Sequence, residues 1–258
     1  MAEPILSVTG LGKAYGELRA VDGLTFHVGA REVLGLVGPN GAGKTTTLRC
    51  LAGIVRPNAG EVRIDGHDLA RAPEAAKRVL AFLPDEPRLF DYLTVKEHLN
   101  LVARLYEVPG WEARADALLA ELELDGKRDA LPGELSRGMK QKLSVACGFL
   151  HEPRLIVLDE PLTGLDPLAI RKMKASLRAR AAGGAALVLS SHLLPLVEEL
   201  CQRVLVIANG RMVAHGTLDE IRGTLGTAGA GASLEDLFVS ITSGAAAEPL
   251  PTTPVGRS

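Results

Sequence analysis

Short apolar runs alternate with amphipathic stretches along most of this chain. Runs of three to five mostly apolar residues, bounded by polar, Gly or Pro residues, predict β-strands. The runs at 155–158 and 186–189 are apolar throughout, as in parallel strands covered on both faces. An Asn209-Gly210 pair separates the last two runs and predicts a hairpin turn. The predicted strands are 5–8, 24–28, 33–37, 61–64, 79–83, 155–158, 186–189, 204–208 and 212–214.

The stretches between these runs have helical periodicity. Thr94 and Glu97 form the T-x-x-E pattern of a capping box, and apolar residues recur after it at helical spacing. Ser136 and Pro167 are typical of helix starts, because serine caps the first amide groups and proline fits the first turn. Helices are predicted at 44–51, from 94 to about 106, and at 111–122, 136–149 and 167–182.

The order of these elements predicts an α/β fold. Strands and helices alternate before residue 88 and after residue 152, while 88–152 is almost purely helical. We therefore expect a mostly parallel sheet with an antiparallel N-terminal β part, and an inserted all-helical subdomain at about 88–152. Residues 1–222 form the expected core domain. The remainder, 223–258, is predicted to form a flexible linker, a short helix at 233–240 and a disordered tail.

Composition narrows the class of protein. With 47% hydrophobic and 23% charged residues, the 258-residue chain is typical of globular proteins rather than disordered ones. Its net charge of −2 lacks the positive field that nucleic-acid binding uses, so no nucleic-acid partner is expected. Three widely spaced cysteines without a C-x-x-C pattern disfavour a disulfide framework or a zinc site.

No apolar run reaches the ~20 residues that span a bilayer, and no signal peptide is recognisable. We therefore expect a cytoplasmic protein.

A glycine-rich stretch carries the clearest chemical pattern. From Gly38 to Thr45 the chain fits G-x-x-x-x-G-K-S/T, between a predicted strand and a predicted helix. Glycines let backbone N–H groups approach phosphates, and the helix N-terminus adds positive potential. Lys44 supplies a charge to the β- and γ-phosphates, and the Thr45 hydroxyl is a ligand for Mg²⁺. We expect a nucleoside triphosphate site formed by Gly38, Pro39, Asn40, Gly41, Ala42, Gly43, Lys44, Thr45 and Thr46.

A second pattern is an apolar strand that ends in two carboxylates. Asp159 is expected to hold Mg²⁺, directly or through water, and Glu160 to orient and polarise the attacking water. Alone, such a pair more often simply ends a strand, but the glycine-rich loop favours the catalytic interpretation. His192 follows the strand at 186–189 and is placed to reach a γ-phosphate, with a surface histidine as the alternative. The predicted catalytic residues are Glu160, His192 and Lys44.

These patterns together resemble the ATP-binding cassette (ABC) ATPases, a subclass of P-loop enzymes. The diagnostic part is Leu135-Ser-Arg-Gly-Met139, which ends 20 residues before Asp159 and is similar to that family's signature motif, usually LSGGQ. The resemblance covers about residues 3–222 and implies a P-loop NTPase core with ATP and Mg²⁺ as cofactors. The other matching positions are Tyr15, the glycine-rich loop, Asp159-Glu160, the loop of Gly164 to Asp166, and His192.

The resemblance also implies an assembly. Two ATPase subunits sandwich two ATP molecules head to tail, and a homodimer is expected, with a heterodimer left open. Ser136 and the backbone of Arg137 and Gly138 then cap the γ-phosphate held by the other subunit, where the helix N-terminus favours an anion. Asp166 is expected to line the seam between the subunits.

Three further positions are assigned by resemblance alone. Tyr15 is implied to stack on adenine with Val21 packed nearby, while a core tyrosine beside an edge strand is the alternative. The family's usual Q-loop glutamine falls at Asp85, judged by the nine-residue step to Thr94. An aspartate there binds Mg²⁺ or water but cannot donate as an amide does. Together with the Ser-Arg-Gly-Met signature, this position is similar to ATPase subunits of type-2 ABC exporters of drugs, antibiotics and polysaccharides.

The function implied is the ATP-hydrolysing subunit of an ABC transporter that powers export. A separate membrane-spanning permease would hold the chain at the cytoplasmic face of the membrane. Leu89, Phe90 and Tyr92 are expected to dock it, although they could instead pack on the following helix. A soluble ABC-type ATPase of DNA repair or translation is the alternative, but the chain has one cassette and no sustained heptads. A generic P-loop kinase or GTPase would leave the signature unexplained. The cargo is not encoded in these patterns.

Overall fold

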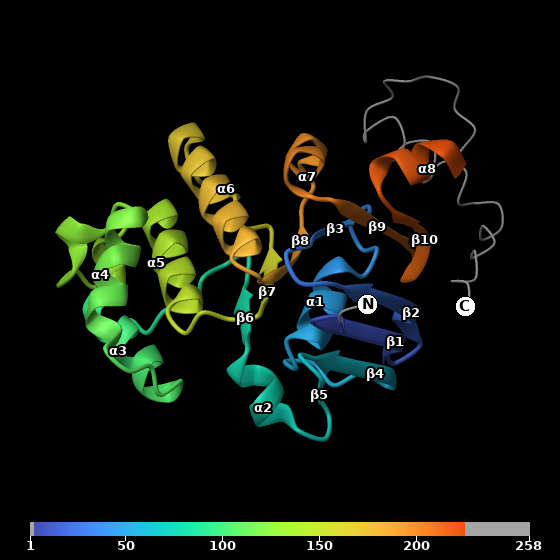
Figure 1. Ribbon diagram of the computed structural model, residues 1–258, viewed down its shortest axis with the longest axis horizontal. Helices are drawn as coiled ribbons and strands as arrows, with labels where there is room; N and C mark the ends of the chain where they lie inside the picture. The colour runs from blue at the N-terminus through green and yellow to red at the C-terminus, as the bar shows by residue number, and fades with distance from the viewer. Residues whose placement is uncertain (1–2, 225–258) are drawn as a thin grey trace.

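Two β-sheets and the helices around them form the part of the chain that the computed structural model describes, residues 3–224 (Figure 1). The linker, short helix and tail expected at 223–258 lie outside these residues apart from the first two positions. In Figure 1, the four-stranded sheet is at one end and the helices of the predicted helical subdomain are at the other. The α/β fold class is confirmed.

The N-terminal sheet is antiparallel, as predicted. Its strand order is β2-β1-β4-β5, and its longest strands, β1 and β2, run well beyond the predicted runs. The pattern underestimates β1 because register shifts between Val8 and Ala14 interrupt the alternation of buried and exposed positions. The strands are β1 (Leu6–Tyr15), β2 (Leu18–Val28), β4 (Ala59–Ile64) and β5 (His67–Asp68).

The second sheet has six strands in the order β10-β9-β3-β8-β7-β6. All neighbouring pairs are parallel except β9 and β10, which form the predicted hairpin around Asn209. Every residue of β3, β7 and β8 is buried, which explains their uninterrupted apolar sequences. The strands are β3 (Val33–Val37), β6 (Leu80–Leu83), β7 (Leu155–Asp159), β8 (Ala186–Ser190), β9 (Arg203–Ala208) and β10 (Arg211–Gly216).

Eight α-helices surround the sheets in the described residues. The chain from β6 to β7 forms α3 to α5 and two short 3₁₀ turns, with no strand between them. The capping box is confirmed, because the Thr94 side chain accepts from the Glu97 N–H and the Glu97 carboxylate accepts from the Thr94 N–H. The helices are α1 (Lys44–Leu51), α2 (Pro73–Arg78), α3 (Val95–Leu105), α4 (Trp111–Glu121), α5 (Arg137–Phe149), α6 (Pro167–Ala182), α7 (Leu194–Leu200) and α8 (Leu218–Thr224).

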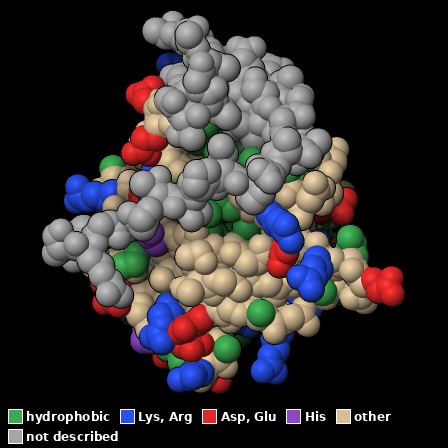
Figure 2. Space-filling view, turned by 90° about the vertical axis from the view of Figure 1, so that its right-hand side faces the viewer, with side chains coloured by type: hydrophobic (Ala, Val, Ile, Leu, Met, Phe, Trp, Pro, Cys, Tyr) green, Lys and Arg blue, Asp and Glu red, His purple; other side chains and the backbone are tan. Residues whose placement is uncertain are grey.

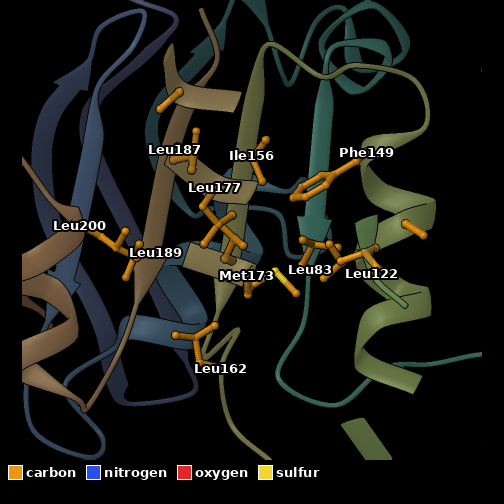
Figure 3. Packing of buried hydrophobic residues seen from close by; sticks show 14 of the residues in the cluster. Leu83, Leu122, Phe149, Ile156, Leu162, Met173, Leu177, Leu187, Leu189 and Leu200 are labelled. Carbon is orange, nitrogen blue, oxygen red and sulfur yellow. The ribbon is translucent and has the colours of Figure 1, made fainter. Parts of the chain in front are cut away.

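Two hydrophobic clusters lie on opposite sides of the six-stranded sheet. One unites α1, the inner face of the four-stranded sheet and one face of β3, β7 and β8. The other joins the opposite face of these strands to α3, α4, α5 and α6. Figure 3 shows Met173 and Leu177 of α6 with Ile156 and Leu187 of the sheet in this second cluster. The core therefore holds the carboxyl ends of the parallel strands rigidly in register.

The helices α2, α7 and α8 and the short strand β5 were not predicted. α2 and α7 have six and seven residues and carry a proline in their first turn. Elements this short contain too few turns for a clear period, so tertiary packing decides them.

On the face at the right of Figure 1, basic and acidic side chains are intermixed in the described residues (Figure 2).

Candidate functional site

The loop between β3 and α1 packs too closely against neighbouring backbone to carry side chains at two of its glycines. Gly43 has a φ of 101°, and a Cβ atom there would lie 2.2 Å from the backbone oxygen of Ala20. A Cβ atom at Gly38 would lie 2.3 Å from the backbone oxygen of Ile207. Gly38 and Gly43 are thus required by the close approach of β9 and β2, as well as by the ligand that the pattern predicts.

A cavity of about 590 Å³ opens over this loop. Its lining brings together residues from four distant parts of the sequence, and most of the predicted site residues are among them. Gly38 and Pro39 shape the loop but do not line the cavity. The lining residues are Tyr15, Leu18, Arg19, Ala20, Asn40, Gly41, Ala42, Gly43, Lys44, Thr45, Thr46, Asp159, Glu160 and Asn209.

The structure distinguishes Val21 from its neighbour Ala20. Val21 is 2% exposed and packs in the core beneath β2, whereas its neighbour Ala20 lines the cavity. Tyr15 is 48% exposed, so it is not the core tyrosine of the alternative interpretation. Its ring lies 5.0 Å from Lys13 Nζ, and Leu18 is its direct cross-strand partner on β2. An exposed ring at the cavity edge is suited to stack on a planar base.

Lys44 is held inside the loop that precedes it. Its Nζ donates to the backbone oxygens of Gly38 at 2.6 Å and Pro39 at 3.1 Å. Burial lowers the pKa of Lys44, and the negative charges of Glu160 and Asp159 partly oppose this change. The ammonium group is therefore already directed into the loop that the pattern assigns to phosphates.

Three oxygen-bearing side chains meet where β7 and β8 end beside the start of α1. Asp159 Oδ1 lies 2.7 Å from Ser190 Oγ, which donates to it, and 3.4 Å from the hydroxyl of Thr45. Hydroxyl and carboxylate oxygens are the ligands that Mg²⁺ takes in such sites, usually with several waters. The Thr45 and Asp159 oxygens are close enough to share one ion, so these residues fit the expected metal. In residues 3–224, no group of three or more His, Cys, Asp and Glu is arranged to hold a metal.

Glu160 is fixed by contacts on both its backbone and its side chain. Its φ is 49°, in the left-handed region that is uncommon for a glutamate, and its N–H donates to Ser190 Oγ at 3.2 Å. The carboxylate Oε2 lies 2.8 Å from His192 Nδ1 and 3.3 Å from the His192 backbone N–H, which donates to it. Glu160 lines the cavity, and both contacts from His192 are to its Oε2. The histidine therefore fixes the orientation of the glutamate carboxylate.

The signature residues lie away from this cavity and do not line it. Ser136 is the N-cap of α5, where its Oγ accepts from the Met139 N–H at 3.2 Å. Arg137 packs over Gly164, since a Cβ atom there would lie 3.0 Å from Arg137 Nε. The signature residues therefore lie outside the cavity over the glycine-rich loop of the same chain.

The remaining loop residues lie at or near helix starts. A Cβ atom at Gly138 would lie 3.5 Å from the Gly164 backbone oxygen, so the two loops touch. Asp166 caps α6 by accepting from the Ala169 N–H at 2.8 Å, and this bond holds its pKa below the usual value. Its carboxylate is therefore committed to the helix end.

Asp85 and the predicted docking residues lie on the segment after β6. The parallel pairing of Leu83 with Leu158 puts Asp85 at the same sheet edge as Glu160, yet Asp85 is exposed and does not line the cavity. Phe90 and Tyr92 are 60% and 91% exposed, which excludes full packing on α3.

Leu89 differs from these two neighbours because it packs against the core. The Phe90 N–H donates to His98 Nε2 at 2.9 Å, which fixes the segment to α3. Next to it, a second cavity of about 530 Å³ is lined by residues that include Ile54, Arg88 and Tyr106.

Several residues of the site were not found from the sequence. Ser190 ends a buried strand, and nothing in its local pattern indicates that it bonds to Asp159. Leu18 and Arg19 follow the turn after Tyr15, and Asn209 was assigned only as a turn residue. The hairpin signal at Asn209 was correct, but its approach to the glycine-rich loop is a tertiary contact, made through the Gly210 N–H to Ala42.

No helix in residues 3–224 has the length and apolar character needed to cross a membrane. The family model described as "ABC transporter" matches residues 21–163. A similar solved structure is described as "Structure of ATP binding subunit of ABC transporter". It has a TM-score of 0.88 and 40% identity, and the match covers 92% of this chain and 99% of that chain.

Curated relatives extend the match to nearly the whole described chain. "ABC-type transporter ATP-binding protein EcsA" of Bacillus subtilis (strain 168) is 35% identical, with 92% of this chain and 96% of that protein covered. "Nod factor export ATP-binding protein I" of Paraburkholderia xenovorans (strain LB400) is 40% identical, with 84% and 72% covered. "Daunorubicin resistance ATP-binding protein DrrA3" of Streptomyces coeruleorubidus is 36% identical, with 88% and 72% covered.

Proposed function

The chain belongs to the ABC transporter family as an ATP-binding subunit, and from this premise we propose that its ATP hydrolysis drives export through a separate membrane-spanning partner. The observation that carries the proposal is the single cavity in which Tyr15, Lys44 and Glu160 meet. An aromatic platform, a phosphate-binding loop and an anchored carboxylate are the groups that ATP hydrolysis needs. The alternative function in DNA repair or translation has no support from the relatives.

In this mechanism the glycine-rich loop and Lys44 bind the phosphate chain. The N-terminus of α1 directs backbone N–H groups at the anion, and the ammonium group supplies charge. Thr45 and Asp159 would hold Mg²⁺, which neutralises charge on the phosphate oxygens when bound. Ser190 keeps Asp159 in place through the 2.7 Å hydrogen bond to its Oδ1.

Glu160 accepts a proton from the attacking water and orients it toward the γ-phosphate. Its carboxylate lines the cavity while His192 donates to Oε2, so one carboxylate oxygen is fixed and the other is available to water. His192 is 60% exposed, and a ring with a proton on each nitrogen would donate one to Glu160 and the other to a phosphate oxygen. The pair therefore combines a base with a group that senses the γ-phosphate.

A second subunit completes each site in this proposal. Ser136, Arg137 and Gly138 lie at the N-terminus of α5 and are exposed or partly exposed, so they are available to another chain's nucleotide. Asp166 lies on the adjacent loop, which supports its expected place at the seam. Asp85 keeps the role of a Mg²⁺- or water-binding residue that responds to the γ-phosphate once the dimer closes.

The partner in the membrane docks beside α3. Phe90 and Tyr92 are exposed aromatics in a chain with only 3% aromatic residues. Arg88, two residues before Phe90, lines the cavity that Ile54 and Tyr106 also line. A short apolar helix of the permease would fill this cavity, while Leu89 packs against the core and holds the segment in place. Such docking keeps the chain on the cytoplasmic face of the membrane.

Export is proposed from the relatives' names, since two of them are called export or drug-resistance ATP-binding proteins. We also retain the proposed division into a nucleotide-binding domain of residues 1–222, with its helical subdomain at about 88–152, and a C-terminal segment from 223.

Two measurements test this function. Purified chain should hydrolyse ATP in the presence of Mg²⁺. Lys44→Ala should weaken ATP binding at least tenfold, because the charge of Lys44 faces the phosphates.

In detergent extracts the chain should co-purify with a membrane-spanning protein. The double variant Phe90→Ala/Tyr92→Ala should lose that partner and keep its ATPase activity. Leu131→Ala, a substitution of another exposed apolar residue at 40% exposure, is the control. Retention of the partner by the double variant would refute the docking site.

A further inference from the structure

A second cation lines the nucleotide cavity and has no role in the function proposed above. Arg19 and Lys44 are the basic residues among those that line it in the described part of the chain. The Arg19 side chain is 74% exposed, and its Nη1 lies 3.6 Å from Asp22 Oδ1, three residues further along β2. An exposed ion pair of this kind contributes little to stability.

Asp22 does not need Arg19 as its counter-ion. Its other oxygen, Oδ2, accepts from Arg211 Nε at 2.9 Å and from Arg211 Nη2 at 2.8 Å. A paired, short contact of this geometry is the stronger of the two interactions of the carboxylate. Arg19 can therefore leave Asp22 without exposing an uncompensated negative charge.

Arg19 lies between the two parts of the cavity that would hold the ends of a nucleotide. On one side, its neighbour Leu18 is the cross-strand partner of Tyr15, the expected platform for the base. On the other side, the backbone oxygen of Ala20 touches Gly43 of the phosphate-binding loop. A nucleotide that reaches from Tyr15 to the loop therefore passes residue 19 with its ribose and α-phosphate.

We propose that Arg19 exchanges its ion pair with Asp22 for the α-phosphate of the nucleotide in this cavity. The inference rests on the proposed ATP-binding function of the cavity and adds a specific contact to it. The Lys44 ammonium group is directed at the β- and γ-phosphates and the loop contributes backbone N–H groups, so Arg19 would add a side-chain charge at the α-phosphate. A guanidinium group suits this task because it donates two parallel hydrogen bonds to phosphate oxygens.

The test is isothermal titration of ATP and ADP into the wild-type chain, Arg19→Ala and Arg71→Ala. Arg71 is the matched control, because it is 86% exposed and forms the same kind of ion pair, 3.5 Å from Asp68 three residues away. Arg19→Ala should weaken the binding of ATP and of ADP equally, by about fivefold, which corresponds to about 1 kcal/mol of binding free energy. The loss should shrink in 0.5 M NaCl, because salt screens exposed charges. Arg71→Ala should bind both nucleotides like the wild type.

Three results would overturn the proposal. Arg19→Ala could bind both nucleotides like Arg71→Ala, which would leave Arg19 without a role. A loss for ATP alone would assign the contact to the γ-phosphate, and a loss that persists in high salt would assign it to an uncharged contact. The proposed function is tested separately by the wild-type titration, because a wild-type chain that binds neither nucleotide refutes ATP binding itself.

Discussion

Replacing Ser190 by alanine tests how far the two carboxylates of β7 depend on the neighbouring strand. Ser190 is fully buried at the end of β8, paired in register with Asp159. Its hydroxyl donates to Asp159 Oδ1 at 2.7 Å and accepts from the Glu160 N–H at 3.2 Å. One side chain thus holds the predicted metal ligand and the backbone of the predicted base.

The expected loss of stability in Ser190→Ala depends on whether each group bonded to the hydroxyl keeps another hydrogen-bond partner. The Glu160 N–H also donates to the Ser190 backbone oxygen at 3.3 Å, so it keeps a partner in the variant. Asp159 Oδ1 retains only the longer contact to Thr45 at 3.4 Å. A buried hydrogen bond to a charged group contributes about 1.5–3 kcal/mol, so we expect a loss of about 2 kcal/mol of unfolding free energy. For a chain of this size, that lowers Tm by about 4–8 °C.

The assay combines urea unfolding without nucleotide with ATPase activity titrated against Mg²⁺. A displaced Asp159 should raise the Mg²⁺ concentration for half-maximal activity, by about fivefold if half of the lost free energy acts on the metal. Ser191→Ala is the matched control: Ser191 is also buried, but its Oγ accepts from the Leu193 N–H and does not contact a carboxylate. If both variants lose equal stability and keep the wild-type Mg²⁺ dependence, the reasoning about Asp159 is wrong.

Two further predictions concern the loop and the pH dependence of stability. Gly43→Ala should reduce ATP affinity by more than tenfold, because its Cβ atom would lie 2.2 Å from the Ala20 backbone oxygen. The control Gly126→Ala, whose Cβ atom would have nothing within 4 Å, should bind ATP like the wild type. If ATP titration shows wild-type affinity for both variants, the packing argument is wrong. Burial, with help from the charge of Arg203, lowers the pKa of His215 to about 4 from 6.5. Between these pH values the unfolded chain binds a proton that the folded chain excludes, so stability falls as pH decreases, by at most about 1.4 kcal/mol per pH unit. Urea unfolding at pH 7 and pH 5 should show a smaller loss in His215→Gln, and an identical loss would count against this assignment.

The sequence predicted those parts of the site whose chemistry and local structure coincide. The bounds of β3 and α1 are as predicted, because the glycine-rich pattern requires a strand before it and a helix after it. Ser136 and Asp166 are N-caps, as their residue types and the apolar periodicity after them indicate. The buried strands β7 and β8 were also found, since the first four of the five buried positions in each form a continuous apolar run.

The parts that could not be predicted depend on register and on distant contacts. The local sequence does not show that Ala20 lines the cavity while Val21 is buried. The pairing of β1 with β2 is irregular there, since Lys13 pairs with Val21 and Ala14 with Arg19, and no sequence period records that shift. Arg19, Ser190 and Asn209 enter the site only because their strands end beside the glycine-rich loop or β7. Their local sequences are compatible with ordinary surface or core positions.

The most direct measurement of the central claim is ATP turnover by Glu160→Gln. Glutamine preserves the shape of the side chain, but it cannot accept the proton from water. General-base catalysis contributes about 10²–10⁴-fold to rate. The account predicts that the variant binds ATP like the wild type, accumulates as a closed dimer in ATP, and hydrolyses ATP at least a hundredfold more slowly. Near-normal turnover by this variant would contradict the account.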